Sequence, residues 1–299
     1  MILSSFAKVN LFLKVLNKRQ DNFHNLITLF ERIDLCDKIV LKMRKDALIK
    51  VTCDDPAVPL DESNLCYRSA ALLQDKFGVK KGVDIRIFKK IPVGAGLGGG
   101  SSNASTALVG LNRLWKLGIS RQRLCRLGAQ IGSDVPFFIH DVPFALGLGS
   151  GEKIKPLASL KKAKLWHLLA VPRIHVSTPT IYRKFDALKR QKKVRAGLTA
   201  PAEGVKILLL SIRKNDLSRI GENLFNSLEP ITIRLCSEVR SVKYKLAKLT
   251  PEKPILMSGS GPAVFCILNS RREAVFLGRR LAWEKPSLRV FVTGTKLNS

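Results

Sequence analysis

The sequence predicts an α+β fold of two domains. Segments in which apolar and polar residues alternate, as in half-buried strands, recur between segments with the apolar spacing of amphipathic helices. Strands with one polar face are typical of antiparallel or mixed sheets that helices cover on one side. A chain of 299 residues also exceeds the usual single core of ~100 to 200 residues. We therefore expect one domain over residues 1–152 and a second over 153–299.

The first half begins with a strand over 6–15, where every second residue is apolar. Comparable patterns predict further strands over 38–42 and 83–88, and helices over 63–77, 101–117 and 120–131. Asn64 and Ser120 stand where the N-caps of two of these helices are expected. The helices in tandem are expected to cover one face of the sheet.

The second half repeats this mixture of elements. A boundary is expected near 147–156, where glycines and a proline precede a new apolar run. Apolar patterns then predict strands over 165–171, 263–268 and 288–293, and helices over 180–188, 202–211 and 229–249. The basic segment 189–195 lies between two of these helices and is interpreted as a solvated loop. Each half is thus expected to have two layers, a sheet and its helices.

The composition excludes several classes of protein. Apolar residues make up 45% of the chain and are spread along it, unlike in disordered or collagen-like proteins. The six cysteines are scattered, without a Cys-x-x-Cys pair or histidines at zinc-ligand spacing, which indicates a reducing compartment. No apolar run approaches the ~20 residues of a membrane span. We therefore expect a cytoplasmic protein without membrane segments.

The net charge is strongly positive. The chain has 52 Lys and Arg residues against 23 Asp and Glu, which gives +29, with +9 in residues 1–150 and +20 in the remainder. Such a field favours polyanionic ligands, either small phosphorylated molecules or nucleic acid. A generally basic surface without a local role is the third interpretation. Only 7% of the residues are aromatic and no RNP-like or K-homology motif is present, which argues against RNA binding as the main function.

The most specific local signal is a glycine-rich run between a predicted strand and a predicted helix. Residues 92–104 read Pro-Val-Gly-Ala-Gly-Leu-Gly-Gly-Gly-Ser-Ser-Asn-Ala. Glycines let successive backbone N–H groups surround an anion, and the N-terminus of the following helix adds unpaired donors. The run therefore predicts a phosphate-binding loop, in which the hydroxyls of Ser101 and Ser102 are candidates to contact a phosphate or Mg²⁺.

Two better-known glycine loops do not fit. A Walker loop requires Gly-Lys followed by Ser or Thr, and no lysine follows Gly100. Residues 94–99 do match Gly-x-Gly-x-x-Gly, but a dinucleotide site also needs an acidic residue ~20 positions later for the ribose. Residues 85–133 contain no Asp or Glu. The sequence thus argues against a nicotinamide cofactor.

The glycine run 92–104 resembles the motif of the galactokinase, homoserine kinase, mevalonate kinase and phosphomevalonate kinase superfamily. The opening 7–13 (Ala-Lys-Val-Asn-Leu-Phe-Leu), with Arg19, Asp21 and 23–26 (Phe-His-Asn-Leu), is similar to that of the 4-diphosphocytidyl-2-C-methyl-D-erythritol kinases. Further similar blocks lie at 63–65, 132–138, 176–179, 223–230 and 257–262. Together these blocks span nearly the whole chain in the order of the family.

The resemblance implies a two-domain small-molecule kinase fold with the active site in the cleft between the domains. The N-terminal domain would be like domain 2 of ribosomal protein S5, and the C-terminal domain ferredoxin-like. ATP and Mg²⁺ would be the cofactors, and the 2-hydroxyl of 4-diphosphocytidyl-2-C-methyl-D-erythritol, of the non-mevalonate isoprenoid pathway, the acceptor. The residues implied to bind the nucleotide are Asn64, Pro92, Gly94, Ala95, Gly96, Leu97, Gly98, Gly99, Gly100, Ser101, Ser102 and Asn103.

Two further residues have implied catalytic roles. Asp134 would take the proton of the attacking hydroxyl, and Lys8 would hold that carboxylate charged and in place. From the residues alone, Asp134 equally fits a helix cap and Lys8 a solvated strand residue. The Mg²⁺ ligands stay unassigned.

The resemblance also implies a site for the cytidine diphosphate of the substrate. His24 would hydrogen bond to the base edge, and Phe23 or Tyr182 would stack on its face. The sequence differs here from the family, which commonly has Tyr in place of Phe23 and often Phe in place of Tyr182. The other residues implied to contact the substrate are Asn10, Gly259, Ser260 and Gly261.

Three alternatives stay open at this point. The chain is a sister kinase acting on homoserine or a mevalonate derivative, a basic RNA-binding protein on a related fold, or a scaffold that has lost activity. The block at 7–13 and His24 argue against the first, and the intact Lys8, Asp134 and glycine run argue against the last. A monomer and a homodimer are both compatible with the sequence.

Overall fold

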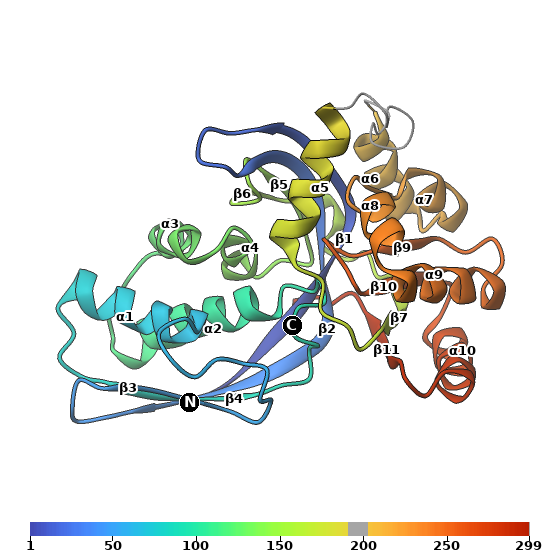
Figure 1. Ribbon diagram of the computed structural model, residues 1–299. Coiled ribbons are helices and arrows are strands. Elements are labelled where there is room, and N and C mark those ends of the chain that lie inside the picture. The colour runs from blue at the N-terminus through green and yellow to red at the C-terminus, as the bar shows by residue number, and fades with distance from the viewer. Residues whose placement is uncertain (191–202, 299) are drawn as a thin grey trace.

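The structure, a computed structural model, describes residues 1–190 and 203–298. Within these residues the strands form one mixed sheet of seven strands and one antiparallel sheet of four (Figure 1). The first sheet contains β1 (Ile2–Lys18), β2 (His24–Met43), β3 (Ile49–Cys53), β4 (Val83–Phe88), β5 (Phe144–Leu148), β6 (Lys153–Pro156) and β8 (Phe225–Asn226). The second contains β7 (Trp166–Val171), β9 (Ile255–Met257), β10 (Val264–Leu268) and β11 (Arg289–Gly294).

Helices accompany both sheets. The first half has α1 (Leu65–Phe77), α2 (Gly99–Leu114), α3 (Arg121–Ile131) and α4 (Val135–His140). A short 3₁₀ turn, Ala158–Leu160, precedes β7. The second half has α5 (Thr178–Arg190), α6 (Gly204–Lys214), α7 (Leu217–Asn223), α8 (Glu229–Leu235), α9 (Ser237–Leu249) and α10 (Arg271–Glu284).

The first sheet has the order β3-β4-β2-β1-β8, with β5 and β6 attached to β2. The pairs β3–β4 and β1–β8 are parallel and the others antiparallel, as the half-exposed strands predict. Helices α1, α2 and α3 share a buried core with β2 and β4, and Figure 1 shows α1 and α2 covering one face of these strands. Asn64 and Ser120 are the N-caps of α1 and α3, as predicted, since each side chain accepts a backbone N–H of its helix.

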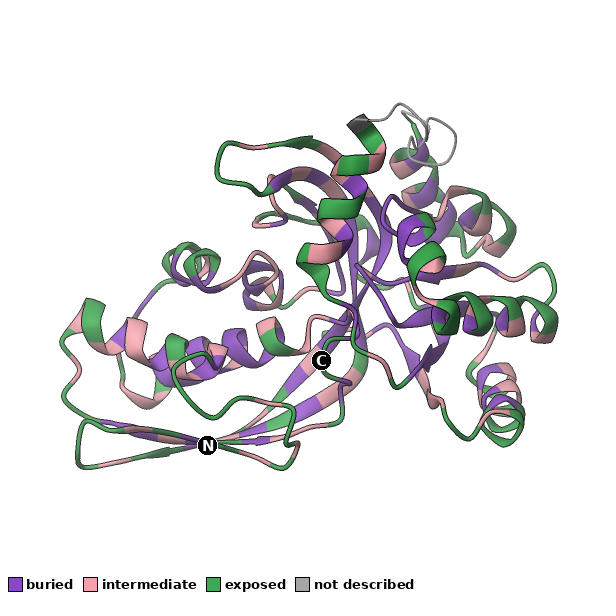
Figure 2. Cartoon of the chain, viewed as in Figure 1, coloured by how far each residue is buried: buried purple, intermediate pink, exposed green. Residues whose placement is uncertain are grey.

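The second sheet has the order β11-β7-β10-β9. Leu168 of β7 and Val264 of β10 pack against α5, α8, α9 and α10. Leu169 and Phe265 belong to another core, which they share with Val9 of β1 and other residues of the first sheet. Figure 2 shows that buried segments predominate where the strands of the two sheets meet. This shared core holds the two halves together and positions the cavity described below.

Some predicted elements differ from the structure. The predicted helix 229–249 is wrong, because Cys236 has extended backbone (φ −122°, ψ 101°) and separates α8 from α9. Apolar spacing continues on both sides of this residue, so the break leaves no trace in the pattern. Residues 191–195 of the predicted basic loop, and residue 202 of a predicted helix, lie outside the described residues. The domain boundary at residue 152 stays a prediction, and β6, which follows it, pairs with β5 of the first sheet.

Candidate active site

A cavity of about 830 Å³ lies between the two halves of the chain. Its walls come from β1, the glycine run, the residues before α4, helix α5 and the loop after β9. Most of the predicted site residues line this cavity, namely Lys8, Asn10, Phe23, His24, Asn64, Pro92, Gly94, Ala95, Gly96, Leu97, Gly98, Gly99, Gly100, Ser101, Asn103, Asp134, Tyr182, Gly259 and Ser260. Residues that are far apart in the sequence thus meet in one place.

The glycine run forms a loop that ends at the N-terminus of α2. Gly94, Gly96 and Gly98 have φ of 66°, 75° and 69°, a region that favours glycine. A Cβ at Gly96 would lie 2.2 Å from the carbonyl oxygen of Ser258, so the loop after β9 packs directly on the backbone of this glycine. The first N–H groups of a helix have no intrahelical partner. Those of α2 therefore make this end of the cavity suitable for an anion.

Backbone contacts hold the loop on both sides. The N–H of Lys8 on β1 donates to the carbonyl of Leu97 at 3.0 Å, and the N–H of Ala263 donates to that of Ala95 at 3.2 Å. The hydroxyl of Ser258 donates to the Gly96 carbonyl at 2.9 Å. The loop is therefore fixed between β1 of the first sheet and the turn that joins β9 to β10 of the second.

Lys8 and Asp134 form an ion pair at the cavity wall. Nζ of Lys8 lies 3.5 Å from Oδ2 of Asp134, and the two side chains are 5% and 29% exposed. Burial lowers the pKa of Lys8, and the charge of Asp134 counteracts part of this shift. Asp134 stands at the N-cap position of α4, but its side chain makes no capping hydrogen bond. The alternative of a helix cap therefore does not account for this carboxylate.

The ammonium of Lys8 is also held by neutral partners. It donates to Oδ1 of Asn10 at 2.6 Å and to the carbonyl of Gly96 at 3.1 Å. The amide of Asn10 donates in turn to the hydroxyl of Thr28 at 2.8 Å. Lys8 and Asn10 lie two residues apart on β1, so both project from the same face of the strand. The lysine is therefore a buried, oriented residue and not the solvated strand residue of the alternative interpretation.

Aromatic rings gather at another part of the cavity wall. The rings of His24 and Tyr182 lie 5.0 Å apart at an interplanar angle of 32°. Phe23 is 57% exposed, and its ring also borders the cavity. Burial raises the pKa of the Tyr182 phenol. This wall therefore offers flat apolar surfaces and a histidine to a ligand.

Two predicted site residues do not line the cavity. The hydroxyl of Ser102 points into the first sheet, where it hydrogen bonds to Ser5 at 2.8 Å. Gly261 instead closes a turn, in which its N–H donates to Ser258. Asn64 caps α1, and it also lines the cavity, so its role near the nucleotide stays a prediction.

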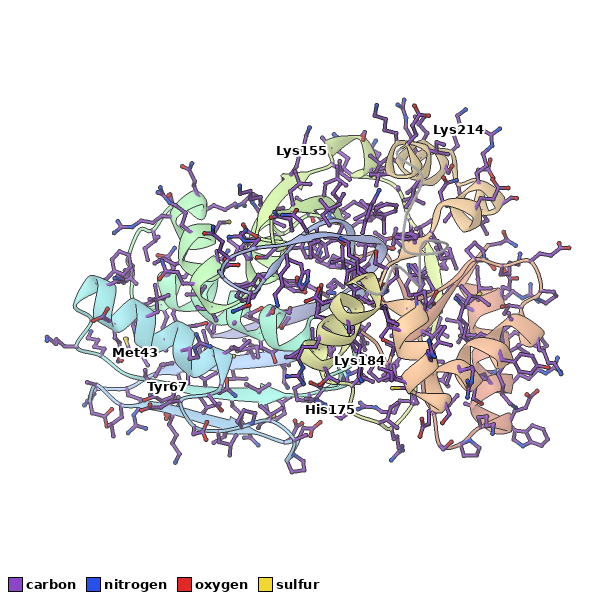
Figure 3. The ribbon with its side chains drawn as sticks, turned by 45° about the horizontal axis from the view of Figure 1, so that its top comes forward. Met43, Tyr67, Lys155, His175, Lys184 and Lys214 are labelled. Atoms are coloured by element: carbon purple, nitrogen blue, oxygen red, sulfur yellow. The ribbon has the colours of Figure 1, made fainter. Side chains whose placement is uncertain are left out.

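Several residues at the site were not predicted from the sequence. Thr28, Lys89, Ser150 and His175 line the cavity. His175 lies on the loop before α5 and is labelled in Figure 3, and its ring is so close to Gly94 that a Cβ there would lie 2.8 Å from its Nδ1. Asp186 contacts the ring of His24 from α5. Only Lys89 has a local hint, since it stands in a basic pair just before the glycine run.

The structure also bears on the metal, membrane and charge predictions. Within the described residues, no group of three or more His, Cys, Asp or Glu side chains is placed to hold a metal ion. No described helix is both long enough and apolar enough to span a membrane. Lys155, Lys184 and Lys214 are exposed, as expected for solvated charges, and Figure 3 shows Lys155 and Lys214 at the edge of the fold.

The chain is similar to known proteins over nearly its whole length. The model for the GHMP kinases N terminal domain matches residues 64–142, and that for the GHMP kinases C terminal domain matches 208–284. A 4-diphosphocytidyl-2-C-methyl-D-erythritol kinase of Shouchella clausii is 41% identical over 92% of this chain and 88% of that protein. The kinase of the same name from Bacillus subtilis is 40% identical over 92% and 91%.

Solved structures agree with these matches. A crystal structure of 4-(cytidine 5'-diphospho)-2C-methyl-D-erythritol kinase has a TM-score of 0.79 and 31% identity, and 98% of each chain is covered. A mevalonate kinase of L. major reaches a TM-score of 0.76 at 15% identity, covering 100% of this chain and 97% of that one, which shows the shared fold alone. The predicted α+β two-domain kinase fold and the family resemblance are thereby confirmed. The chain belongs to the GHMP kinase family and, within it, to the 4-diphosphocytidyl-2-C-methyl-D-erythritol kinases.

Proposed function

We propose that the protein transfers the γ-phosphoryl group of ATP to the 2-hydroxyl of 4-diphosphocytidyl-2-C-methyl-D-erythritol, a step of the non-mevalonate isoprenoid pathway. One observation carries the proposal: a single cavity contains a glycine loop, a lysine–aspartate pair and an aromatic wall with a histidine. These features suit a phosphate chain, an alcohol and a nucleobase. Relatives with about 40% identity bear the name of this kinase.

The glycine loop is the proposed site of the ATP phosphates. Successive backbone N–H groups and the N-terminus of α2 provide donors and a positive dipole end for the phosphate oxygens. The hydroxyl of Ser101, in the first turn of α2, borders the same space. Asn64 at the start of α1 borders the cavity as well and is proposed to lie near the nucleotide.

Asp134 is the proposed general base. Its carboxylate would accept the proton of the substrate hydroxyl as the oxygen attacks the γ-phosphorus and the bond to the ADP oxygen breaks. Lys8 would orient the carboxylate and offset the charge that gathers on the transferred group. Asn10 and the Gly96 carbonyl direct the ammonium of Lys8, so the base and the phosphate loop are positioned together.

The family implies Mg²⁺, which would neutralise charge on the ATP phosphates. The donor set suits a metal held mainly by phosphate oxygens and water, because the described residues offer no carboxylate cluster at the cavity. Ser101 and Asp134 are among the cavity residues whose side-chain oxygens could reach such a metal, whereas the hydroxyl of Ser102 is bonded to Ser5.

The aromatic wall is the proposed cytidine site. A cytosine ring would stack on Tyr182 or Phe23, with His24 at its edge. Gly259 and Ser260 lie at the cavity beside the glycine loop and are proposed to contact the substrate near its phosphates. Because Phe23 lacks a hydroxyl, stacking is the interaction that it can supply.

The alternatives are less favoured. Homoserine and mevalonate kinases share the fold at 13–19% identity, which gives no support for their substrates. RNA binding as the main function has no support among the relatives, which are named kinases. All six cysteines lie in the described part of the chain as free thiols, in accord with a cytoplasmic protein. A monomer and a homodimer both fit the proposal.

An ATP-consumption assay tests the function. Purified protein would receive ATP and Mg²⁺ with the cytidine-diphosphate methylerythritol, homoserine or mevalonate, and a reaction without acceptor measures background hydrolysis. Turnover restricted to the cytidine compound is expected. Turnover with homoserine or mevalonate instead would show a sister kinase, and ATP binding without transfer to any acceptor would leave the fold assignment standing but refute the activity.

A further inference from the structure

Asp186 contacts a residue of the proposed cytidine site without itself lining the cavity. Its Oδ1 lies 2.6 Å from Nε2 of His24. The Asp186 and His24 side chains are 17% and 5% exposed, so little water competes for this contact. An ionised carboxylate only accepts hydrogen bonds, which places the hydrogen on Nε2 of the histidine.

The contact is supported from several sides. Lys18 lies opposite His24 in the register of β1 and β2, and its Nζ is 3.5 Å from Oδ2 of Asp186. Tyr182, Phe185 and Asp186 occupy one face of α5, because they are three and four residues apart. The Phe185 ring meets the His24 ring edge-on at 6.3 Å, and Tyr182 lies over it at 5.0 Å. In Figure 1, α5 runs beside the hairpin of β1 and β2 that carries His24.

This geometry has a chemical consequence for a ligand. A neutral histidine with its hydrogen on Nε2 has a bare Nδ1, which is an acceptor. Since Asp186 occupies Nε2, Nδ1 is the ring nitrogen left for a molecule in the cavity. The exocyclic amino group of cytosine is a donor and pairs with such an acceptor, whereas the corresponding oxygen of uracil is itself an acceptor.

We propose that Asp186 is a positioning residue that fixes the tautomer of His24 and so makes the site select cytosine over uracil. The inference rests on the proposed function, in which this wall holds a cytidine diphosphate. A site built to pair with a donor rejects an analogue that presents an acceptor, because both acceptors lose their partners. The expected preference for the cytosine compound is roughly 10- to 100-fold.

Calorimetric titration of the full chain with CDP and with UDP tests the selection. We expect wild type to bind CDP more tightly than UDP by the stated factor. In Asp186→Asn the amide presents either its oxygen or its NH₂ to Nε2, so the tautomer is no longer fixed and the ratio should fall to about 3-fold or less. Asp186→Glu keeps a carboxylate and should restore most of the preference. Equal affinities in wild type, or an unchanged ratio in Asp186→Asn, would overturn the proposal.

The tautomer itself is measurable by ¹⁵N NMR on histidine-labelled protein. The chain has four histidines, so His24→Gln identifies the signals of His24. Wild type should show a protonated Nε2 and a bare Nδ1, and Asp186→Asn a mixture of tautomers. A hydrogen on Nδ1 in wild type would refute the inference, and this result requires no variant of Asp186, since His24→Gln serves only to assign the signals.

The outcomes also separate this inference from the proposed function. Preferential CDP binding without phosphoryl transfer to the cytidine substrate would refute the kinase activity and leave the role of Asp186 intact. Transfer with equal affinity for CDP and UDP would refute the role of Asp186 and leave the kinase activity intact. The KM for ATP, which binds at the glycine loop, should be the same in wild type and Asp186→Asn.

Discussion

Two lysine–aspartate pairs lie beside the same cavity, yet they are built differently. Lys8 and Asp134 are 3.5 Å apart, and the Asp134 side chain is 29% exposed. Lys89 and Asp37 form a tighter ion pair, in which Asp37 has no exposed surface. Both lysines line the cavity, whereas of the two carboxylates only Asp134 does.

The two carboxylates differ in how many hydrogen-bond donors their oxygens contact. Oδ1 of Asp37 accepts the backbone N–H groups of Lys90 and Ile91, and Oδ2 accepts from Lys89 and Asn103. Among the described residues, Asp134 has Lys8 as its partner and no other. A carboxylate takes up a proton from a ligand only where a lone pair is free. Asp37 therefore anchors the segment between β4 and the glycine loop, whereas Asp134 has an oxygen that could accept a proton.

The largest expected effect is on catalysis. Asp134→Ala removes the proposed base and should lower kcat by ~10² to 10⁴-fold, the usual contribution of a general base. The variant should still fold, with a smaller loss of unfolding free energy than Asp37→Ala, because Lys8 keeps its hydrogen bonds to Asn10 and to the Gly96 carbonyl and no backbone N–H loses an acceptor. Turnover near the wild-type rate would show that Asp134 is not the base.

Asp37→Ala should produce the opposite result. The substitution leaves Lys89 buried without its counter-ion and two backbone N–H groups without acceptors, at a cost of about 3–5 kcal/mol in the free energy of unfolding. Urea unfolding measures this loss. Asp46→Ala is the matched control, since Asp46 also pairs with a basic residue but in an exposed turn, and it should change stability far less. Equal urea midpoints for Asp37→Ala and Asp46→Ala would show that the Lys89–Asp37 pair has no special structural role.

Gly96→Ala tests the loop that receives the hydrogen bond of Lys8. At φ 75° a Cβ would lie 2.2 Å from the Ser258 carbonyl, so the loop must move. We expect a loss of about 1–3 kcal/mol in unfolding free energy and a rise of about tenfold in the KM for ATP. Gly78→Ala is the control, because Gly78 has φ 60° at the end of α1 with no atom within 4 Å of its Cβ position. It should be destabilised without any change in KM.

The smallest effect concerns the pH dependence of stability. Burial lowers the pKa of Lys8 below its ordinary 10.5, so the native state holds this proton less tightly than the unfolded chain. The charged form therefore costs stability at neutral pH, and the cost falls as pH rises toward 10.5. Lys8→Met should lose activity but unfold within about 1 kcal/mol of wild type at pH 7. Between about pH 7 and about pH 10, urea unfolding should show the unfolding free energy of wild type rising relative to that of Lys8→Met. An equal pH dependence in the two proteins would contradict a lowered pKa of Lys8.

Local features of the fold and the site could be predicted because short-range physics encodes them. The glycine run predicts its own loop, since residues with φ above +60° and a helix N-terminus are needed within a few positions. The caps at Asn64 and Ser120 and the period-two pattern of β1 are equally local. The positions of Lys8, Asp134 and His24 at the site were inferred from the family resemblance and not from periodicity.

Contacts between distant residues could not be predicted in this way. Strand β2 contains Glu31, a buried charged residue that pairs with His167 more than a hundred positions away. Because a charged residue interrupts the apolar pattern, that pattern does not predict the full length of β2. In the sequence, Asp37 cannot be distinguished from an exposed aspartate of a strand. Only its ion pair with Lys89 in the folded chain shows that it is buried. The break at Cys236 also lies within an unbroken apolar spacing.

The α+β class, a glycine loop that leads into a helix and the resemblance to the family could be predicted from the residues alone. Tertiary packing places Ser102 against Ser5 and not at the cavity, leaves Asp134 with Lys8 as its partner while Asp37 has four donors, and brings Asp186 against His24. The two sets of features differ in the sequence separation over which the responsible interactions act. Propensity, capping and glycine φ act over a few residues, whereas burial and hydrogen-bond partners depend on how the two sheets and their helices pack together.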